Sequence, residues 1–273
     1  MQRIFLLRAY GDFVIALQAI SRSKQKIQIV ASDHLAPLYH ALITAKVLDP
    51  LPIEFIALGI QQGQLNFFTN KHLLSFDTLK QLSRLKAYIK SNPNQYGVDW
   101  LEHEIRMKHL NFLLGHRFKA VVSVEANVYQ AYDKWLELEQ LEIQERYIKT
   151  DHPLKIITIP DARLSKRVIQ PSILELLRKY TISKGFEWKI ARLRTQLVSS
   201  DMVYENFESL VNIIETADFI ICTDSLSAHL ASLLKKPHYI LYPKGGMTIF
   251  FTPYAQAFDA AGNFEQTNFT FLN

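Results

Sequence analysis

The residue types best suited to chemistry lie in one short stretch, residues 223–231, with the sequence TDSLSAHLA. They follow a short β-branched apolar run, residues 219–222, which predicts a buried strand, and the apolar residues that come next recur at helical spacing. A helix that starts directly after a strand presents unpaired backbone amides and partial positive charge, and α/β proteins bind phosphates at such ends. Ser225 and His229 are four residues apart and share one helix face. The stretch therefore predicts an anion site.

A structural interpretation of the same residues is open. Asp224 or Ser225 can cap the first turn of the helix, and His229 can simply pack beside the apolar stripe. Taken by spacing alone, this interpretation is favoured, because helix caps are common and a single histidine is weak support for a ligand site.

Two further polar groups follow predicted strands. Residues 3–8 are predicted to form a buried strand, after which Gly11 can relax a turn and Asp12 lies at or next to the cap of an apolar helix. In the second half, the strand predicted at residues 154–159 leads into residues 160–167, with the sequence PDARLSKR. From the residues alone, a plain helix cap and a basic surface loop explain these two groups.

In this order, the three groups resemble glycosyltransferase family 9, the heptosyltransferase-like enzymes of lipopolysaccharide assembly. The string DSLSAHLA is similar to the family's donor-phosphate motif D-[ST]-G-x-x-H-L-A, with Leu226 in place of the glycine. The opening RAYGDFVIALQAI is similar to the family's strand, R-x-(loop)-G-D and apolar helix. The string IPDARLSKRVIQP is similar to H-P-G-A-x-x-x-x-K-R-W-P, with Asp161 in place of the glycine.

The resemblance implies roles for these residues. Asp12 is expected to be the general base that takes the proton of the acceptor hydroxyl. Lys166 is expected to neutralise the diphosphate as it leaves, where charge builds on the bridging oxygen. The residues expected to bind the donor phosphates are Arg167, Asp224, Ser225, Leu226 and His229. A loop of Lys244, Gly245 and Gly246 matches the family's glycine and proline loop near the donor, although the two glycines also suit a simple turn.

The function implied by the resemblance is transfer of a sugar, heptose in the family, from a nucleotide diphosphate sugar to a saccharide or lipopolysaccharide-core acceptor, with inversion. No metal and no cofactor besides the nucleotide-sugar substrate are expected. Two alternatives are open: a non-catalytic relative that binds nucleotide or glycan, because Leu226 and Asp161 replace glycines near the phosphates, and a nucleotide-sugar epimerase of the same fold.

Composition agrees with a globular protein of this kind. The chain has 273 residues, 48% of them apolar, and a net charge of +5, which suits an anionic partner such as a sugar nucleotide, a phosphorylated glycolipid or a membrane surface. The basic residues are scattered and carry no nucleic-acid motif, so no nucleic acid is expected. The single cysteine, Cys222, and the lack of a signal peptide or a membrane-spanning run predict a cytoplasmic protein. Whether it also contacts the cytoplasmic face of the inner membrane as a peripheral protein is left open by the sequence.

The elements that must position these residues follow from periodicity. Strands and helices alternate along the chain, which predicts parallel sheets with crossover helices. Between them, helical patterns are predicted over residues 76–89, 100–114 and 204–215, the last capped from Ser199, Ser200 or Asp201. The polar residues 150–153 are the best linker. We therefore expect an α/β protein of GT-B type: two Rossmann-like domains, an acceptor-binding one at 1–152 and a nucleotide-sugar-binding one at 153–273, whose parallel sheets face a cleft.

Overall fold

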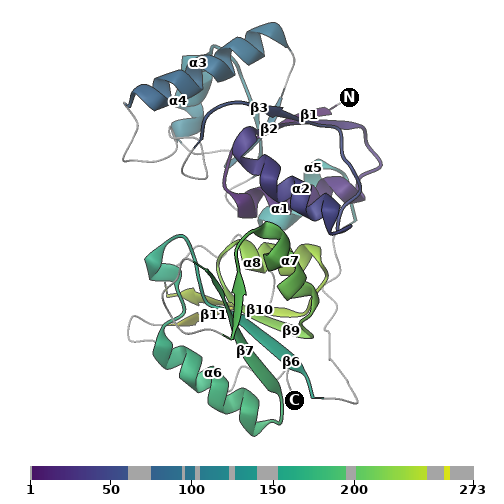
Figure 1. The fold of residues 1–273 in the computed structure, drawn as a ribbon. Coiled ribbons are helices and arrows are strands. Elements are labelled where there is room, and N and C mark those ends of the chain that lie inside the picture. Colours follow the sequence, from purple (N-terminus) through teal and green to yellow (C-terminus); the bar gives the residue numbers. More distant parts are fainter. Residues whose placement is uncertain are drawn as a thin grey trace. The chain divides into compact units, whose positions relative to one another are not determined.

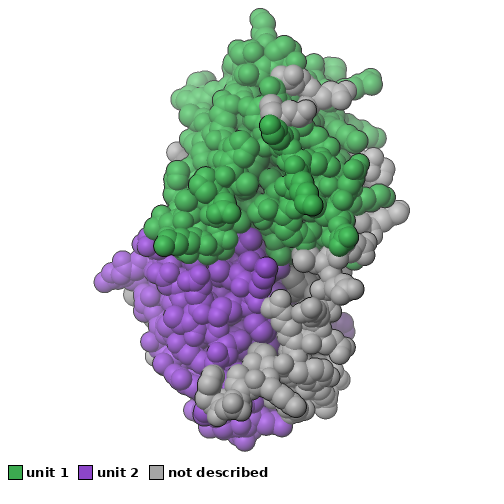
Figure 2. Space-filling model, turned by 90° about the vertical axis from the view of Figure 1, so that its right-hand side faces the viewer, with its two compact units in different colours: residues 1–140 green, residues 141–273 purple. Residues whose placement is uncertain are grey.

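The computed structural model describes residues 2–60, 75–93, 96–101, 105–122, 127–139, 153–194, 201–244 and 255–258 of the chain. The chain divides into two compact units, Met1–Gln140 (unit 1) and Leu141–Asn273 (unit 2), coloured green and purple in Figure 2. The division and the predicted boundary at residue 152 both lie in residues 140–152, outside the described ranges. Each unit has a parallel sheet of its own.

Unit 1 is Rossmann-like, with five described strands in the order β3-β2-β1-β4-β5. Strand β1 is central and pairs in parallel with β2 on one side and β4 on the other. The strands are β1 (Gln2–Leu6), β2 (Ile27–Ser32), β3 (Ile53–Ile56), β4 (Gly97–Leu101) and β5 (Lys119–Val122). The helices are α1 (Tyr10–Arg22), the 3-10 helix η1 (Asp33–Leu35), α2 (Ala36–Thr44), α3 (Phe76–Ser91), α4 (Ile105–Leu114) and α5 (Val128–Trp135).

Helices cover both faces of the first sheet (Figure 1). Because successive strand residues point to opposite faces, Phe5 and Leu7 share one face, where they join an apolar cluster with Leu85 of α3 and Leu110 of α4. Strand order runs one way from β1 to β3 and the other way from β3 to β5. Right-handed crossovers therefore place α1 and α2 on the face opposite to α3 and α4.

Unit 2 has the same design, with six described strands in the order β11-β10-β9-β6-β7-β8, all pairs parallel. The strands are β6 (Lys155–Ile159), β7 (Glu187–Leu193), β8 (Met202–Tyr204), β9 (Phe219–Thr223), β10 (His238–Pro243) and β11 (Ala255–Phe258). The helices are the 3-10 helix η3 (Ser165–Arg167), α6 (Pro171–Ser183), α7 (Phe207–Glu215) and α8 (Leu226–Leu233).

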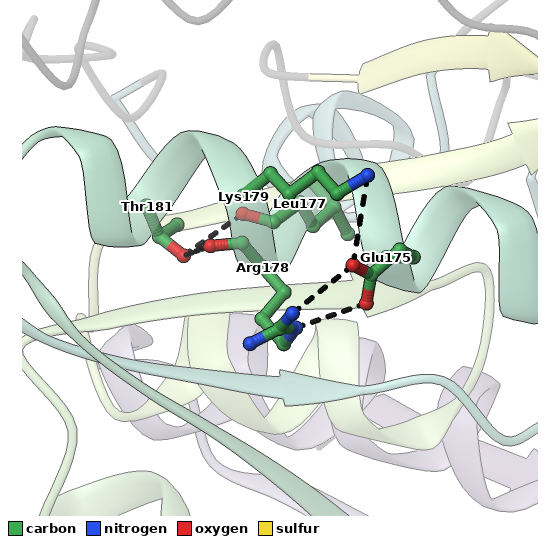
Figure 3. A network of polar contacts seen from close by, with 5 residues as sticks. All are labelled: Glu175, Leu177, Arg178, Lys179 and Thr181. Carbon is green, nitrogen blue, oxygen red and sulfur yellow. Dashed lines mark hydrogen bonds and ion pairs between the residues drawn. The ribbon is translucent and has the colours of Figure 1, made fainter.

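Helix α6 is amphipathic and shows how this unit is assembled. Its apolar side packs Ile173 and Leu177 onto strand residues of β6, β9 and β10. On its exposed side, the Arg178 guanidinium donates to both carboxylate oxygens of Glu175, at 2.9 and 3.1 Å (Figure 3). Exposed pairs of this kind contribute little to stability, so burial of the apolar side holds the helix in place.

The alternation of strands and helices is confirmed, but two predicted helices are partly wrong. Residues 100–114 contain the end of β4 before α4 begins at Ile105, and residues 202–204 form β8 before α7 begins at Phe207. The predicted cap of α7 is also wrong. Asn206 caps this helix by accepting a hydrogen bond from the Ser209 amide at 2.9 Å, whereas Asp201 accepts one from the Ile190 amide at 2.8 Å. Ser199 and Ser200 lie outside the described residues.

The reason for both errors is local. Each misassigned segment is a short strand close to a helix, and a window set for helical periodicity includes it in that helix. Among the described helices, none has the length and apolar character that crossing a bilayer requires.

Candidate functional site

Strand order brings the predicted residues of unit 2 to one place. Strands β6 and β9 are neighbours in the sheet, with Ile159 opposite Cys222, although they are far apart in the sequence. The connections that leave their carboxyl ends run in opposite directions along the sheet, which makes this the topological switch point of the unit. Such points are where open α/β sheets bind ligands. The loop of residues 160–167 and the turn before α8 therefore meet where the fold favours a ligand.

An ion pair joins these two segments. Arg167 Nη1 lies 2.8 Å from Asp224 Oδ2 and 3.4 Å from the Asp224 carbonyl oxygen, and the Thr223 hydroxyl donates to the Arg167 carbonyl. The Asp224 side chain is 9% exposed and that of Arg167 is 36% exposed. The carboxylate thus fixes one edge of the guanidinium while a third of the side chain stays open to an anion.

Helix α8 begins at Leu226, directly after β9, as the sequence predicts. Ser225 occupies the N-cap position, but its side chain makes no capping hydrogen bond; its hydroxyl lies 2.8 Å from that of Ser227. The predicted side-chain cap by Ser225 is therefore wrong, because its hydroxyl turns to Ser227, whereas the Asp224 carboxylate pairs with Arg167. The first amides of α8 carry the partial positive charge of a helix N-terminus.

His229 is a buried neutral imidazole. It lies in the second turn of α8 and is 5% exposed. Burial first, and then the neighbouring His238 and Arg167, lower its pKa to about 3. At neutral pH His229 therefore offers a hydrogen bond and no charge.

The remaining predicted residues of unit 2 lie at the same edge of the sheet. Lys166 is exposed in η3, and Lys244 is exposed directly after β10, the parallel neighbour of β9. Leu226 is half-buried. Gly245 and Gly246 lie outside the described residues. Arg167, Asp224 and His229 are thus brought together. Lys166 follows β6 and Lys244 follows β10, the two strands on either side of β9, and both side chains are exposed.

Asp161 has a partner that the sequence does not suggest. Its Oδ1 accepts a hydrogen bond from Arg192 Nη1 at 2.6 Å, and both side chains are 7% exposed. Asp161 Oδ2 and Arg192 Nε make no hydrogen bond within the described residues. Burial raises the pKa of Asp161, although Arg192 opposes the shift; burial and the Asp161 charge raise the pKa of Tyr204 to about 12. The Asp161 carboxylate therefore pairs with a side chain near the end of β7. The sequence pattern did not identify that side chain, Arg192.

In unit 1, Asp12 also lies at a switch point, here between β1 and β4. It is in the first turn of α1, whose N-cap is Ala9. Asp12 Oδ1 is 3.2 Å from Arg8 Nη1, and both side chains are 14% exposed. The position between strand and helix is as expected, and the Arg8 pair is the addition that the structure makes.

Asp99 is a second acid at this switch point and was not a predicted site residue. It belongs to β4 and is 2% exposed. Its carboxylate accepts hydrogen bonds from the Leu7 and Arg8 amides at 3.1 to 3.2 Å. Burial raises the pKa of Asp99 to about 7; Arg8 lowers it and the Asp12 charge raises it. The sequence did contain a signal for Asp99: it lies within residues 97–101, a short segment with valine and tryptophan that is typical of a strand. The helix predicted from residue 100 onward concealed this strand.

Within the described residues, no group of three or more His, Cys, Asp and Glu side chains is arranged to hold a metal ion.

No protein-family model matches the chain, and no curated protein matches it in sequence. Solved structures do match over nearly its whole length. The glycosyl transferase family 9 protein of Veillonella parvula is 13% identical, with a TM-score of 0.59, and the match covers 95% of this chain and 86% of that one. E. coli heptosyltransferase WaaC, solved with ADP-2-deoxy-2-fluoro heptose, is 12% identical, with a TM-score of 0.55 and coverage of 96% and 94%.

A third structure gives the same result. E. coli ADP-heptose lipopolysaccharide heptosyltransferase II is 12% identical, with a TM-score of 0.53, and the match covers 94% of this chain and 90% of that one. At these identities the likeness concerns the fold. The chain has two Rossmann-like units in sequence, each with a parallel sheet, and shares the GT-B fold of these glycosyltransferases, as predicted.

Proposed function

We propose that the chain is a glycosyltransferase that moves a sugar from a nucleotide diphosphate sugar to a hydroxyl of a saccharide or glycolipid. The observation that carries the proposal is the Arg167–Asp224 pair, because it joins two separately predicted parts of a diphosphate site at a switch point. A helix N-terminus beside a partly exposed guanidinium suits a diphosphate. Structures of the same fold contain ADP or an ADP-heptose analogue, which supports this class of donor.

In the proposed reaction, the acceptor oxygen forms a bond to the anomeric carbon as the bond between that carbon and the diphosphate oxygen breaks. Arg167 and Lys166 offset the charge that grows on the diphosphate, and the amides at Ser225 and Leu226 add donors. Neutral His229 adds a hydrogen bond. Lys244, at the next strand end, is proposed to contact phosphate or sugar. We propose that these cations offset the charge without a metal ion or a cofactor.

Asp12 is proposed to take the proton of the acceptor hydroxyl. The Arg8 guanidinium at 3.2 Å favours the ionised carboxylate that a base requires. Attack from the face opposite to the leaving diphosphate inverts the anomeric configuration. The proton lost by the acceptor ends on Asp12, and the diphosphate leaves with the bonding electron pair.

The finer proposal is ADP-heptose as donor and lipopolysaccharide core as acceptor, at the cytoplasmic face of the inner membrane. It rests on the fold shared with enzymes whose names specify ADP-heptose and lipopolysaccharide. The exposed apolar residues of α3 and α4 are proposed to contact the membrane: Phe76, Leu79, Phe112 and Leu113.

A non-catalytic binding protein is the second candidate. The observation in its favour is that α8 begins at Leu226, at the position where the family motif has glycine. A side chain here can keep a diphosphate away from the backbone amides. Asp161, the other replaced glycine, supports it less, because its carboxylate is paired with Arg192.

The first test is calorimetric titration with ADP, UDP and GDP. The wild type is expected to bind one of them selectively, and Arg167→Met is expected to weaken that binding at least tenfold, since a hydrogen bond to a charged group contributes about 1.5–3 kcal/mol. Arg178→Met is the matched control, because its guanidinium pairs with Glu175 on the exposed side of α6. Equal binding by both variants would remove Arg167 from the site.

The second step is turnover of the corresponding nucleotide sugars with a saccharide acceptor. Transfer that is abolished in Asp12→Ala, with nucleotide affinity nearly unchanged, is the expected result. Epimer formation would point to the epimerase class. Selective nucleotide binding without turnover of any donor would favour the non-catalytic candidate.

A further inference from the structure

We propose that Asp99 is a positioning residue for Asp12: it fixes the turn that precedes Asp12 and, together with Arg8, sets the basicity of that carboxylate. The inference rests on the proposed function, in which Asp12 accepts the proton of the acceptor hydroxyl. The inference depends on electrostatic coupling between the Asp99 and Asp12 carboxylates, and this coupling can be measured without turnover.

Asp99 holds the end of β1 in place. Strands β1 and β4 pair up to Phe5↔Val98, so Asp99 follows the last paired position. There its carboxylate takes over the role of a strand partner: Asp99 Oδ1 and Oδ2 accept from the Leu7 amide at 3.2 and 3.1 Å, and Oδ2 accepts from the Arg8 amide at 3.2 Å. Buried amides need such acceptors. The backbone between β1 and α1 is therefore anchored by this one side chain.

Arg8 connects the two acids. Its Nη1 lies 3.2 Å from Asp12 Oδ1 and donates to the Asp99 backbone carbonyl at 3.4 Å. The guanidinium is thus held by β4 while it pairs with the acid of α1. The guanidinium therefore lies beside both acids, and the two carboxylates act on each other electrostatically across a short, mostly buried distance.

The groups that face this cluster come from three parts of unit 1. The turn after β1 and the start of α1 supply Arg8 and Asp12, β4 supplies Asp99, and α5 supplies Tyr132. The Tyr132 side chain is 1% exposed and its hydroxyl makes no hydrogen bond within the described residues. Burial, followed by the charges of Asp99 and Asp12, raises the pKa of Tyr132 well above its ordinary value, so it stays uncharged. The cluster therefore contains one cation and two acids.

Two acids that share one cation cannot both ionise without cost. Burial first, and the Asp12 charge in addition, raise the pKa of Asp99 to about 7 against the opposing effect of Arg8. Coupling between titrating groups is reciprocal, so an ionised Asp99 raises the pKa of Asp12 by the same interaction. Below pH 7 Asp99 is mostly protonated and Arg8 acts on Asp12 alone. Above pH 7 Asp99 is ionised and Asp12, still ionised itself, becomes a stronger base.

The coupling is tested by NMR titration of the full chain labelled with ¹³C at the aspartate carboxyl carbons. In the wild type, Asp99 is expected to titrate near pH 7. In Asp12→Asn, its inflection is expected to move to lower pH, because the like charge is removed. Asp133→Asn is the matched control, since Asp133 is a buried acid of the same unit that pairs with Arg22, and it is expected to leave the inflection in place. An Asp99 inflection that is the same in wild type and Asp12→Asn would overturn the inference.

The effect on turnover is tested with Asp99→Asn, which keeps the size of the side chain. Its transfer rate is expected to fall about three- to tenfold at pH 8 and less than twofold at pH 6, because a permanently neutral residue 99 resembles the protonated acid. A merely structural role would lower the rate equally at both pH values. If Asp99→Asn does not fold, the Asp12→Asn titration still decides the question, since it leaves Asp99 unchanged.

The two proposals fail separately. Transfer that requires Asp12 but shows the same pH profile in wild type and Asp99→Asn would overturn the positioning role and leave the function standing. A coupled Asp99 in a protein that turns over no nucleotide sugar would support the coupling and overturn the function.

Discussion

His229 shows how burial limits what a residue can do. A cationic histidine beside a diphosphate would add charge, but this imidazole is buried and lies near Arg167 and His238. Burial first, and then the neighbouring His238 and Arg167, oppose its protonation. The role proposed for it at an anion site is therefore a single directed hydrogen bond.

This leads to a prediction on pH dependence. His229→Ala is expected to weaken nucleoside diphosphate binding roughly fivefold, the value of one hydrogen bond of about 1 kcal/mol. The ratio of the variant and wild-type dissociation constants is expected to stay constant from pH 5.5 to 8, because the pKa of His229 is about 3. Calorimetry at four pH values measures the ratio, which cancels the titration of the ligand phosphate. A ratio that grows on acidification through pH 6.5 would show that the imidazole becomes charged.

At the scale of elements, the Arg192–Asp161 pair ties the end of β6 to the end of β7. These strands are parallel neighbours, and the pair links their carboxyl ends at the start of the loop that carries Arg167. Breaking a buried pair by removing one partner leaves an uncompensated charge, whereas removing both is much milder.

Arg192→Met is therefore expected to destabilise unit 2 by about 3–5 kcal/mol, and the double variant Arg192→Met/Asp161→Leu by clearly less. Urea unfolding followed by Trp188 fluorescence, with Trp100 and Trp135 replaced by phenylalanine, reports this unit. The loss in Arg192→Met is expected to shrink between pH 7 and pH 5, because the pKa of Asp161 is already raised and Arg192 no longer opposes protonation. A double variant as unstable as the single one would show that Asp161 is not the reason for the loss.

Helices α3 and α4 bear on how the whole molecule meets its surroundings. Phe76 and Phe112 are 79% and 85% exposed, and exposed lysines accompany them on the same helices, among them Lys80, Lys90 and Lys108. Large exposed apolar side chains next to basic ones favour contact with an anionic surface.

For the whole molecule we predict binding to vesicles that contain phosphatidylglycerol and little binding to pure phosphatidylcholine. The variant Phe76→Ser/Phe112→Ser is expected to bind vesicles at least tenfold more weakly, as measured by co-sedimentation. The reason is that the variant lacks the apolar area that the two phenylalanine rings would bury in the bilayer. Val203→Ser is the control, since Val203 is exposed in unit 2. Unchanged vesicle binding in the double variant would exclude this face as the contact.

The sequence by itself determined the class of fold and the start of the candidate site. Alternating periodicity, which depends only on neighbours in the chain, predicted parallel α/β units, and the turn from residue 223 into α8 is where the local pattern places it. The same dependence on neighbours explains the errors at residues 100–114 and 204–215, where a short strand borders a helix.

Only the tertiary structure decided which side chains meet. Strand order places β6 beside β9 and β1 beside β4, and this order follows from how helices and strands pack, which no local pattern encodes. The pairs Arg167–Asp224, Arg192–Asp161 and the Asp99 contacts to Leu7 and Arg8 all cross such strand neighbours. The motifs named Asp12, Arg167 and Asp224, whereas Asp99 and Arg192, and with them the charge states of the candidate site, depend on packing between residues distant in the sequence.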